Sequence, residues 1–126
     1  MTGIKAFSLV CVPITDSDAS VDFYVGKLGF EKRTDTEFGN GYRWIEVYVG
    51  DSPTGIALAP PPPDRPVTPT QTGITFQSDD VDATHAELKG KGVDVDEEIM
   101  RMGAPVPDMF WFRDPDGHTL MVIQAP

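Results

Sequence analysis

One order of secondary structure occurs twice along the 126 residues: a strand, a helix and then three further strands. Apolar, β-branched runs predict the strands, and apolar residues at helical spacing after a capping residue predict the helices. The first copy is expected to comprise a strand over 6–14, a helix over about 16–28, and strands over 30–36, 42–49 and 54–59. The second is expected to comprise a strand over 73–78, a helix over 81–90, and strands over 94–100, 109–113 and 119–124. This internal repeat indicates two modules of the same fold.

Local signals support these elements. Asp16 or Ser17 can cap the first helix, because a short oxygen side chain accepts hydrogen bonds from the free N–H groups of the first turn. The segment Phe38-Gly39-Asn40-Gly41 is typical of a turn, since glycine and asparagine tolerate positive φ. Strict alternation follows, which places Tyr42, Trp44, Glu46 and Tyr48 on one face of a strand and Ile45, Val47 and Val49 on the other.

The two copies are separated by PPPPDRPVTPTQ, residues 60–71. Six prolines remove backbone donors and favour an extended path, so this segment is predicted to be a semi-rigid connector. A docking site for a polyproline-binding module is the alternative function, although connectors of this composition are much commoner.

Three segments carry a family resemblance: SVDFYVGKLGF in the first copy, and DDVDATHAELKGKGV and FRDPDGHTLMVIQ in the second. In this order and spacing they resemble the vicinal oxygen chelate superfamily, which includes glyoxalase I, extradiol dioxygenases and bleomycin-resistance proteins. The resemblance implies an α+β fold in which two βαβββ modules form curved mixed sheets around a ligand cavity. It also implies a single domain over 1–126, with module 1 at about 4–60 and module 2 at about 72–126, and a homodimer.

Metal-dependent members of that family take one ligand from the first and the last strand of each module. By motif, these positions fall on Leu9, Ala57 (or Leu58 if the register differs by one), Gly73 and Met121. Leucine, alanine and glycine side chains offer no lone pair, and a thioether suits softer metals. His85 is expected on a helix surface and His118 as an exposed residue after a turn, away from the ligand strands. We therefore expect no metal and no other cofactor, and metal-dependent glyoxalase or dioxygenase activity is not expected.

The resemblance and the strand alternation together predict the wall of a ligand pocket. Its residues are expected to be Leu9, Cys11, Trp44, Glu46, Tyr48, Thr75, Gln77, Trp111 and Met121. Tryptophan and tyrosine can stack on a flat ligand and keep a hydrogen-bonding tip. Two of these residues have other interpretations: Cys11 as a small core residue, and Trp111 as part of the core or of a dimer interface.

Glu46 is the sharpest candidate for catalysis, because a carboxylate between two aromatic side chains can act as an acid or base. The commoner alternative is a strand glutamate that points to water or pairs with Arg43 or Arg113. Neither histidine is expected near Cys11, which argues against Cys11 as a nucleophile.

Charge and composition exclude some function classes. The formal net charge of −10 repels phosphate backbones, so nucleic acid binding is not expected. No apolar run approaches the roughly 20 residues of a membrane helix, and the first residues lack the pattern of a signal peptide. A single cysteine fits a reducing compartment, so a cytoplasmic location is expected.

Three functions remain. The first is a metal-free small-molecule-binding protein of the glyoxalase/bleomycin resistance type, whose ligand the sequence does not identify. The second is a metal-independent enzyme of the same fold, such as a lyase or isomerase, that uses a cavity residue such as Glu46 or Tyr48 as acid or base. The third is a non-catalytic dimerising or regulatory module.

Overall fold

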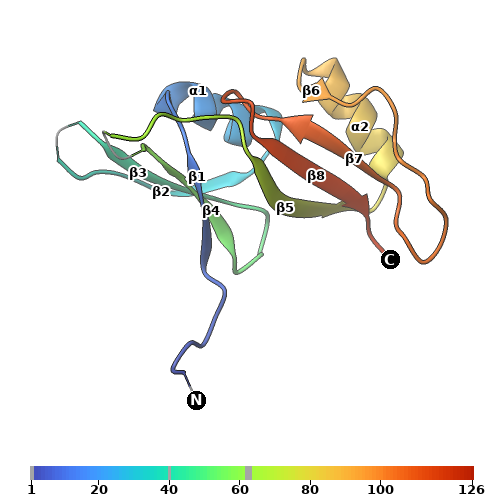
Figure 1. Cartoon of the computed structure of the whole chain (residues 1–126), viewed down its shortest axis with the longest axis horizontal. Helices are drawn as coiled ribbons and strands as arrows, with labels where there is room; N and C mark the ends of the chain where they lie inside the picture. Colours follow the sequence, from blue (N-terminus) through green and yellow to red (C-terminus); the bar gives the residue numbers. More distant parts are fainter. Residues whose placement is uncertain (1, 40, 62–63) are drawn as a thin grey trace. The chain divides into compact units, whose positions relative to one another are not determined.

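The computed structural model describes residues 2–39, 41–61 and 64–126. The chain divides into two compact units, Met1–Val67 and Thr68–Pro126. Each unit contains one four-stranded sheet and one helical segment (Figure 1). Asn40, inside the predicted turn, and two prolines of the predicted connector lie outside the described residues.

The first unit has the predicted strand–helix–strand–strand–strand order. Its elements are β1 (Leu9–Pro13), α1 (Ser17–Val21), η1 (Asp22–Lys27), β2 (Glu31–Glu37), β3 (Arg43–Tyr48) and β4 (Gly55–Ala59). In the sheet the strands are ordered β1-β4-β3-β2, with β1 parallel to β4 and the other pairs antiparallel. The first strand of the unit therefore pairs with the last.

The second unit repeats this topology. Its elements are β5 (Gln71–Ser78), α2 (Val81–Gly90), β6 (Asp94–Val95), β7 (Met109–Arg113) and β8 (Thr119–Gln124). The strands are ordered β5-β8-β7-β6, again with the first parallel to the last. The predicted α+β fold with two mixed-sheet βαβββ modules is confirmed.

Both helical segments begin at a capping aspartate. Asp16 Oδ1 accepts a hydrogen bond from the Ala19 N–H at 3.1 Å, and Asp80 Oδ1 accepts one from the Ala83 N–H at 3.0 Å. The predicted first helix is regular only as far as Val21. It then widens into a π-helix, in which the Leu28 N–H donates to the Phe23 carbonyl five residues earlier.

Two predicted strands are shorter than expected. The first begins at Leu9 rather than at residue 6: Leu9 pairs with Gly55, the first residue of β4, and the preceding Phe7 is 72% exposed. The strand expected over 94–100 is reduced to β6, with one isolated bridge between Met100 and Met109. Asp94, within β6, and Asp96, just after it, both pair with Arg113, at 2.9 and 2.7 Å.

In each unit one face of the sheet is buried and the other is partly open. On β3, Ile45 and Val47 are fully buried with Tyr24 of η1, whereas Val49, expected on the same face, is 42% exposed beyond the end of the strand. In the second unit, Phe110 and Phe112 of β7 are buried. The opposite faces carry the side chains from which a site can be built.

Candidate functional site

The partly open face of the first sheet is organised in rows across its strands. Glu46 on β3 pairs with Thr34 on β2 and with Ala57 on β4, and Ala57 pairs with Cys11 on β1. Because paired residues point to the same side of a sheet, these side chains share one face. The β4 residues on this face, Gly55, Ala57 and Ala59, are small, which leaves room above them for the larger side chains of β3.

Trp44, Glu46 and Tyr48 form a hydrogen-bonded cluster on this face. The indole Nε1–H of Trp44 donates to Glu46 Oε2 at 2.8 Å, and the hydroxyl of Tyr48 donates to Glu46 Oε1 at 2.8 Å. All three side chains are half-buried. The carboxylate is thus held by one donor on each oxygen, and both donors are uncharged. We call these three residues the β3 cluster.

The position of Tyr48 is fixed from the neighbouring strands. The guanidinium carbon of Arg33 lies 4.2 Å from the centre of the Tyr48 ring, and a register shift between Lys32 and Thr34 marks the bulge that holds Arg33. On β4, a Cβ on Gly55 would meet the Tyr48 ring at 2.6 Å, so only glycine permits this packing. The hydrogen bond to Glu46, and then burial, raise the pKa of the Tyr48 phenol.

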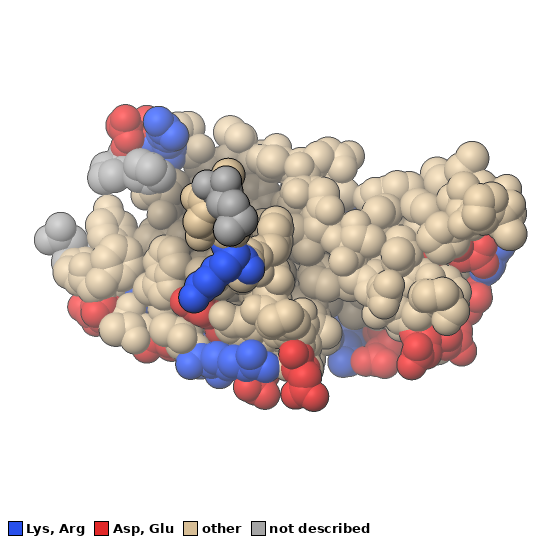
Figure 2. All heavy atoms as spheres, turned by 90° about the horizontal axis from the view of Figure 1, so that it is seen from below, with Lys and Arg blue, Asp and Glu red and all other residues tan. Residues whose placement is uncertain are grey.

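The two arginines predicted as partners of Glu46 bind other groups. Arg43 contacts Asp18 and Asp35, both at 2.7 Å, and Arg113 contacts Asp94 of β6 and Asp96 just after it. In Figure 2, most basic side chains likewise have an acidic one beside them. Within the part of the chain that the structure describes, Glu46 has no ion pair. The interpretation of Glu46 as a salt-bridge residue is therefore wrong.

Leu9 and Cys11 lie on β1, two positions apart and on the same side of the first sheet. Leu9 pairs with Gly55 and is half-buried, whereas Cys11 is exposed. The interpretation of Cys11 as a core residue is wrong for this reason. Both residues therefore share the face of the β3 cluster.

The corresponding face of the second sheet carries the other predicted wall residues. Thr75 on β5 pairs with Met121 on β8, which pairs with Trp111 on β7. The next row continues from Gln77 to Ile123. Thr75 and Gln77 are exposed, and Trp111 and Met121 are half-buried. Trp111 lies opposite the buried face of β7, which excludes it from the core of its own unit.

The positions implied as metal ligands do not fit a divalent ion. The pairing of Glu46 with Ala57 shows that Ala57, rather than Leu58, lies on the face of Glu46, although both residues are fully buried. Together with Leu9, Gly73 and Met121, that position offers no nitrogen or oxygen from a side chain. No reaction step through such an ion follows from these residues.

One group of metal-ligating atoms does converge in the described residues. Atoms of Asp114, Asp116 and His118 lie within 4.8 Å of one another. They are engaged in the turn between β7 and β8: Asp114 Oδ1 accepts from the Asp116 and His118 N–H groups at 3.0 and 2.9 Å, and His118 Nδ1 accepts from the Thr70 N–H at 3.2 Å. These bonds give the group a structural role.

Both histidines differ from their predicted surface positions. His118 was expected to be exposed, but it is fully buried under the segment that leads into β5. His85 is half-buried on α2: its Nε2 lies 2.6 Å from the Asp96 carbonyl oxygen, and its ring packs edge-on against Phe110 at 4.9 Å. Burial and these contacts give both rings a structural role.

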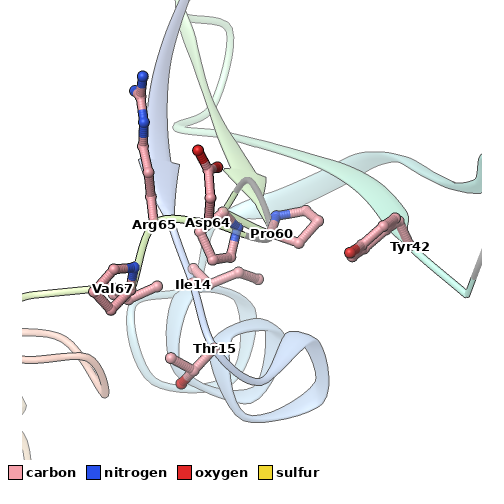
Figure 3. Close-up of a pocket in the computed structure, with 9 residues that line it drawn as sticks. Ile14, Thr15, Tyr42, Pro60, Asp64, Arg65 and Val67 are labelled. Carbon is pink, nitrogen blue, oxygen red and sulfur yellow. The ribbon is translucent and has the colours of Figure 1, made fainter.

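A feature that sequence reasoning missed is a hollow of about 690 Å³ in the first unit. It is lined by Ile14, Thr15, Tyr42, Pro60, Pro61, Asp64, Arg65, Pro66 and Val67 (Figure 3). In Figure 3 the Tyr42 hydroxyl points toward Pro60, while the side chains of Asp64 and Arg65 extend away from Thr15. Residues of the predicted connector thus form one wall of a hollow beside the start of β3. The sequence signal for the position of Tyr42 was the strand alternation over 42–49, which places Tyr42 on the same face as Trp44.

Comparison with known proteins shows the family. Residues 6–122 match the model of the Glyoxalase/Bleomycin resistance protein/Dioxygenase superfamily, and the chain belongs to that superfamily. The chain is similar to TnmS3, an antibiotic binding protein from Streptomyces sp. CB03234, with 31% identity and a TM-score of 0.83 over 100% of both chains.

Two further relatives also match nearly the full length of this chain. A member of the superfamily from Sphaerobacter thermophilus is 28% identical, with a TM-score of 0.86 over 97% of this chain and 98% of its own. The uncharacterized protein YetH of Bacillus subtilis is 25% identical over 124 residues, which is 94% of this chain and 98% of YetH. No helix in the described part of this chain has the length and apolar character needed to cross a membrane.

Proposed function

We propose that this chain is a metal-free small-molecule-binding protein of the glyoxalase/bleomycin resistance type that holds a flat organic ligand. The observation that carries the proposal is the β3 cluster, a tryptophan and a tyrosine fixed around one carboxylate on a partly open sheet face. Ligand sites commonly combine apolar and aromatic walls with a few placed polar groups. An indole whose N–H is already engaged presents its ring faces for stacking.

The second unit supplies a comparable surface for the proposal. Trp111 and Met121 are half-buried neighbours on paired strands, with Thr75 and Gln77 on the same face. A polarisable thioether beside an indole suits an aromatic ligand. As part of the proposal, this face is a second candidate surface for a flat ligand, considered by itself.

The similarity to an antibiotic binding protein over the full length supports binding rather than turnover. The residues at the implied metal positions support a function without a divalent ion, since none of them offers an oxygen or nitrogen ligand. As part of the proposal, the protein acts in the cytoplasm as a homodimer, without nucleic acid or membrane partners.

An enzyme that uses Glu46 as a base is the second candidate, and the hydrogen bond between Glu46 and Tyr48 is the observation that favours it. Against it, both carboxylate oxygens already accept a hydrogen bond, from Trp44 and Tyr48, so a substrate proton would compete with these two donors. A purely dimerising or regulatory module is the third candidate, but it gives no reason for a hydrogen-bonded cluster on an open face.

The experiment is a titration of the full chain with a library of flat aromatic compounds, monitored by tryptophan fluorescence. We expect saturable quenching that EDTA does not change and that Trp44→Phe or Trp111→Phe reduces. Failure of every compound, or a divalent ion bound at unit stoichiometry by elemental analysis, would overturn the proposal. Turnover that Glu46→Gln abolishes while binding persists would select the enzyme.

A further inference from the structure

We infer that the ligand carries a protonated nitrogen beside its flat ring, and that Glu46 is the residue that selects it. This inference rests on the proposed function and names the ligand class for the same site. It follows from the charges around the β3 cluster, which leave one carboxylate oriented but not neutralised.

The two donors to Glu46 fix its carboxylate without cancelling its charge. Trp44 Nε1–H and the Tyr48 hydroxyl are neutral and lie 2.8 Å from the two oxygens. Each carboxylate oxygen can accept a further hydrogen bond. The raised pKa of Tyr48 agrees with this arrangement, because the phenol stays protonated as a donor. The cluster therefore presents a directed negative charge between two aromatic rings.

The nearby cations have other partners. Arg33 Nε lies 2.8 Å from Glu31, its guanidinium donates to the Gly50 carbonyl, and its charge lies over the Tyr48 ring. Arg43 is held by two aspartates. Among the residues that the structure describes, no lysine or arginine pairs with Glu46. A cation that pairs directly with Glu46 would therefore have to come from the ligand.

The rest of the row favours a cation over an anion. Thr34 and Ala57, which flank Glu46 across the sheet, are uncharged. A ligand ammonium would form a charge-assisted hydrogen bond with Glu46, and the face of the Trp44 ring would attract the same charge. A ligand carboxylate would meet the like charge of Glu46 in a partly desolvated position, which opposes binding. The cluster thus discriminates by the sign of the ligand charge.

The test uses three probes that share one ring system: naphthylmethylamine, naphthylmethanol and naphthoate. Binding to the full chain is followed by NMR through the indole N–H signal of Trp44, which Trp44→Phe identifies. We expect the amine to bind about tenfold more tightly than the alcohol, the naphthoate to bind more weakly than both, and the amine to shift the Trp44 signal.

The Glu46→Gln variant keeps the shape of the side chain but removes the charge; its amide oxygen can still accept from the Trp44 indole, and its NH2 group can donate to the Tyr48 hydroxyl oxygen. We expect it to bind the amine and the alcohol equally, while Glu37→Gln, the same change at an exposed position on β2, keeps the preference.

An amine that binds no better than the alcohol overturns the inference and leaves the proposed function standing. A preference that survives in Glu46→Gln assigns it to the net charge of the protein and also overturns the inference. No binding of any of the three probes counts against both the inference and the flat-ligand proposal.

Discussion

Tyr48 lies against the backbone of Gly55, so closely that a methyl group on Gly55 would come within 2.6 Å of the ring. The two residues belong to adjacent strands, β3 and β4, and the contact sets where the Tyr48 hydroxyl meets Glu46. A glycine therefore shapes the β3 cluster without belonging to it.

Gly55→Ala is expected to destabilise the protein by about 1–3 kcal/mol, because the added methyl group forces the Tyr48 ring or the strand to move. Chemical denaturation measures the loss. Gly90→Ala is the matched control, since a methyl group at this position, the end of α2, would have nothing within 4 Å, and the φ of Gly90 is not positive. This control should be neutral or slightly stabilising. An equal loss in both variants would show that the Tyr48 contact is not the cause.

Glu46→Gln is expected to lower the pKa of Tyr48 toward its ordinary value, because the charged acceptor that favours the protonated phenol is lost. A spectrophotometric titration at alkaline pH checks this, with Tyr48→Phe identifying the step that belongs to Tyr48. Because the pKa of Tyr48 is higher in the folded state than in the unfolded state, this group stabilises the fold below the unfolded pKa. This contribution to stability is lost as pH rises through the folded pKa. An unchanged Tyr48 step in Glu46→Gln would contradict the hydrogen bond.

Asp35 is expected to stabilise the first unit at neutral pH and to lose this contribution in acid. Its hydrogen bonds with Arg43 and then Lys32 hold its pKa far below the ordinary value. A depressed folded pKa gives stability that is present above the unfolded pKa of about 3.9 and lost as pH falls toward the folded one. Asp35→Asn should therefore be less stable than wild type at neutral pH, by an amount that shrinks below about pH 4. Urea denaturation across this pH range measures the difference in unfolding free energy between wild type and variant. A difference that does not change with pH would contradict the ion pairs.

Ser20→Ala is expected to leave stability unchanged or raise it by about 1 kcal/mol. Ser20 is 1% exposed, and its hydroxyl has no hydrogen-bond partner among the described residues, so its removal abolishes a buried unsatisfied group. The control is Ser78→Ala: the Ser78 hydroxyl lies 2.6 Å from that of Thr84 and accepts from the Asp80 N–H at 3.1 Å. Thermal denaturation should show a loss of stability for Ser78→Ala but not for Ser20→Ala. A clear loss for Ser20→Ala would reveal a partner for that hydroxyl.

The alternation of β3 was enough to predict which face carries Trp44, Glu46 and Tyr48, because a period of two leaves only two choices for a half-buried strand. The repeated order of strands and helix was also predictable, because each helix and most strands have a signal in their own local sequence. The sequence did not predict that Arg43 and Arg113 pair with aspartates rather than with Glu46, because strand alternation does not show where these long side chains lie.

Contacts between distant segments explain the other errors. His118 looks like an exposed residue after a turn, but Thr70 and Pro69, almost 50 positions earlier, lie over that turn; Pro69 is 3.2 Å from the Cβ position of Gly117. Gly55 is one of 12 glycines, and only the pairing of β3 with β4 distinguishes it. Local patterns do not contain this information.

The parallel pairing of β1 with β4 has a consequence for synthesis. In the first unit β1 pairs only with β4, the last strand of the unit. The sheet therefore cannot be completed until the ribosome has released the chain as far as Ala59. Until then the apolar residues of β1 have no partner strand, and the same delay recurs for β5, which waits for β8. Synthesis of this chain therefore passes through two periods in which an unpaired strand is exposed to other proteins in the cell.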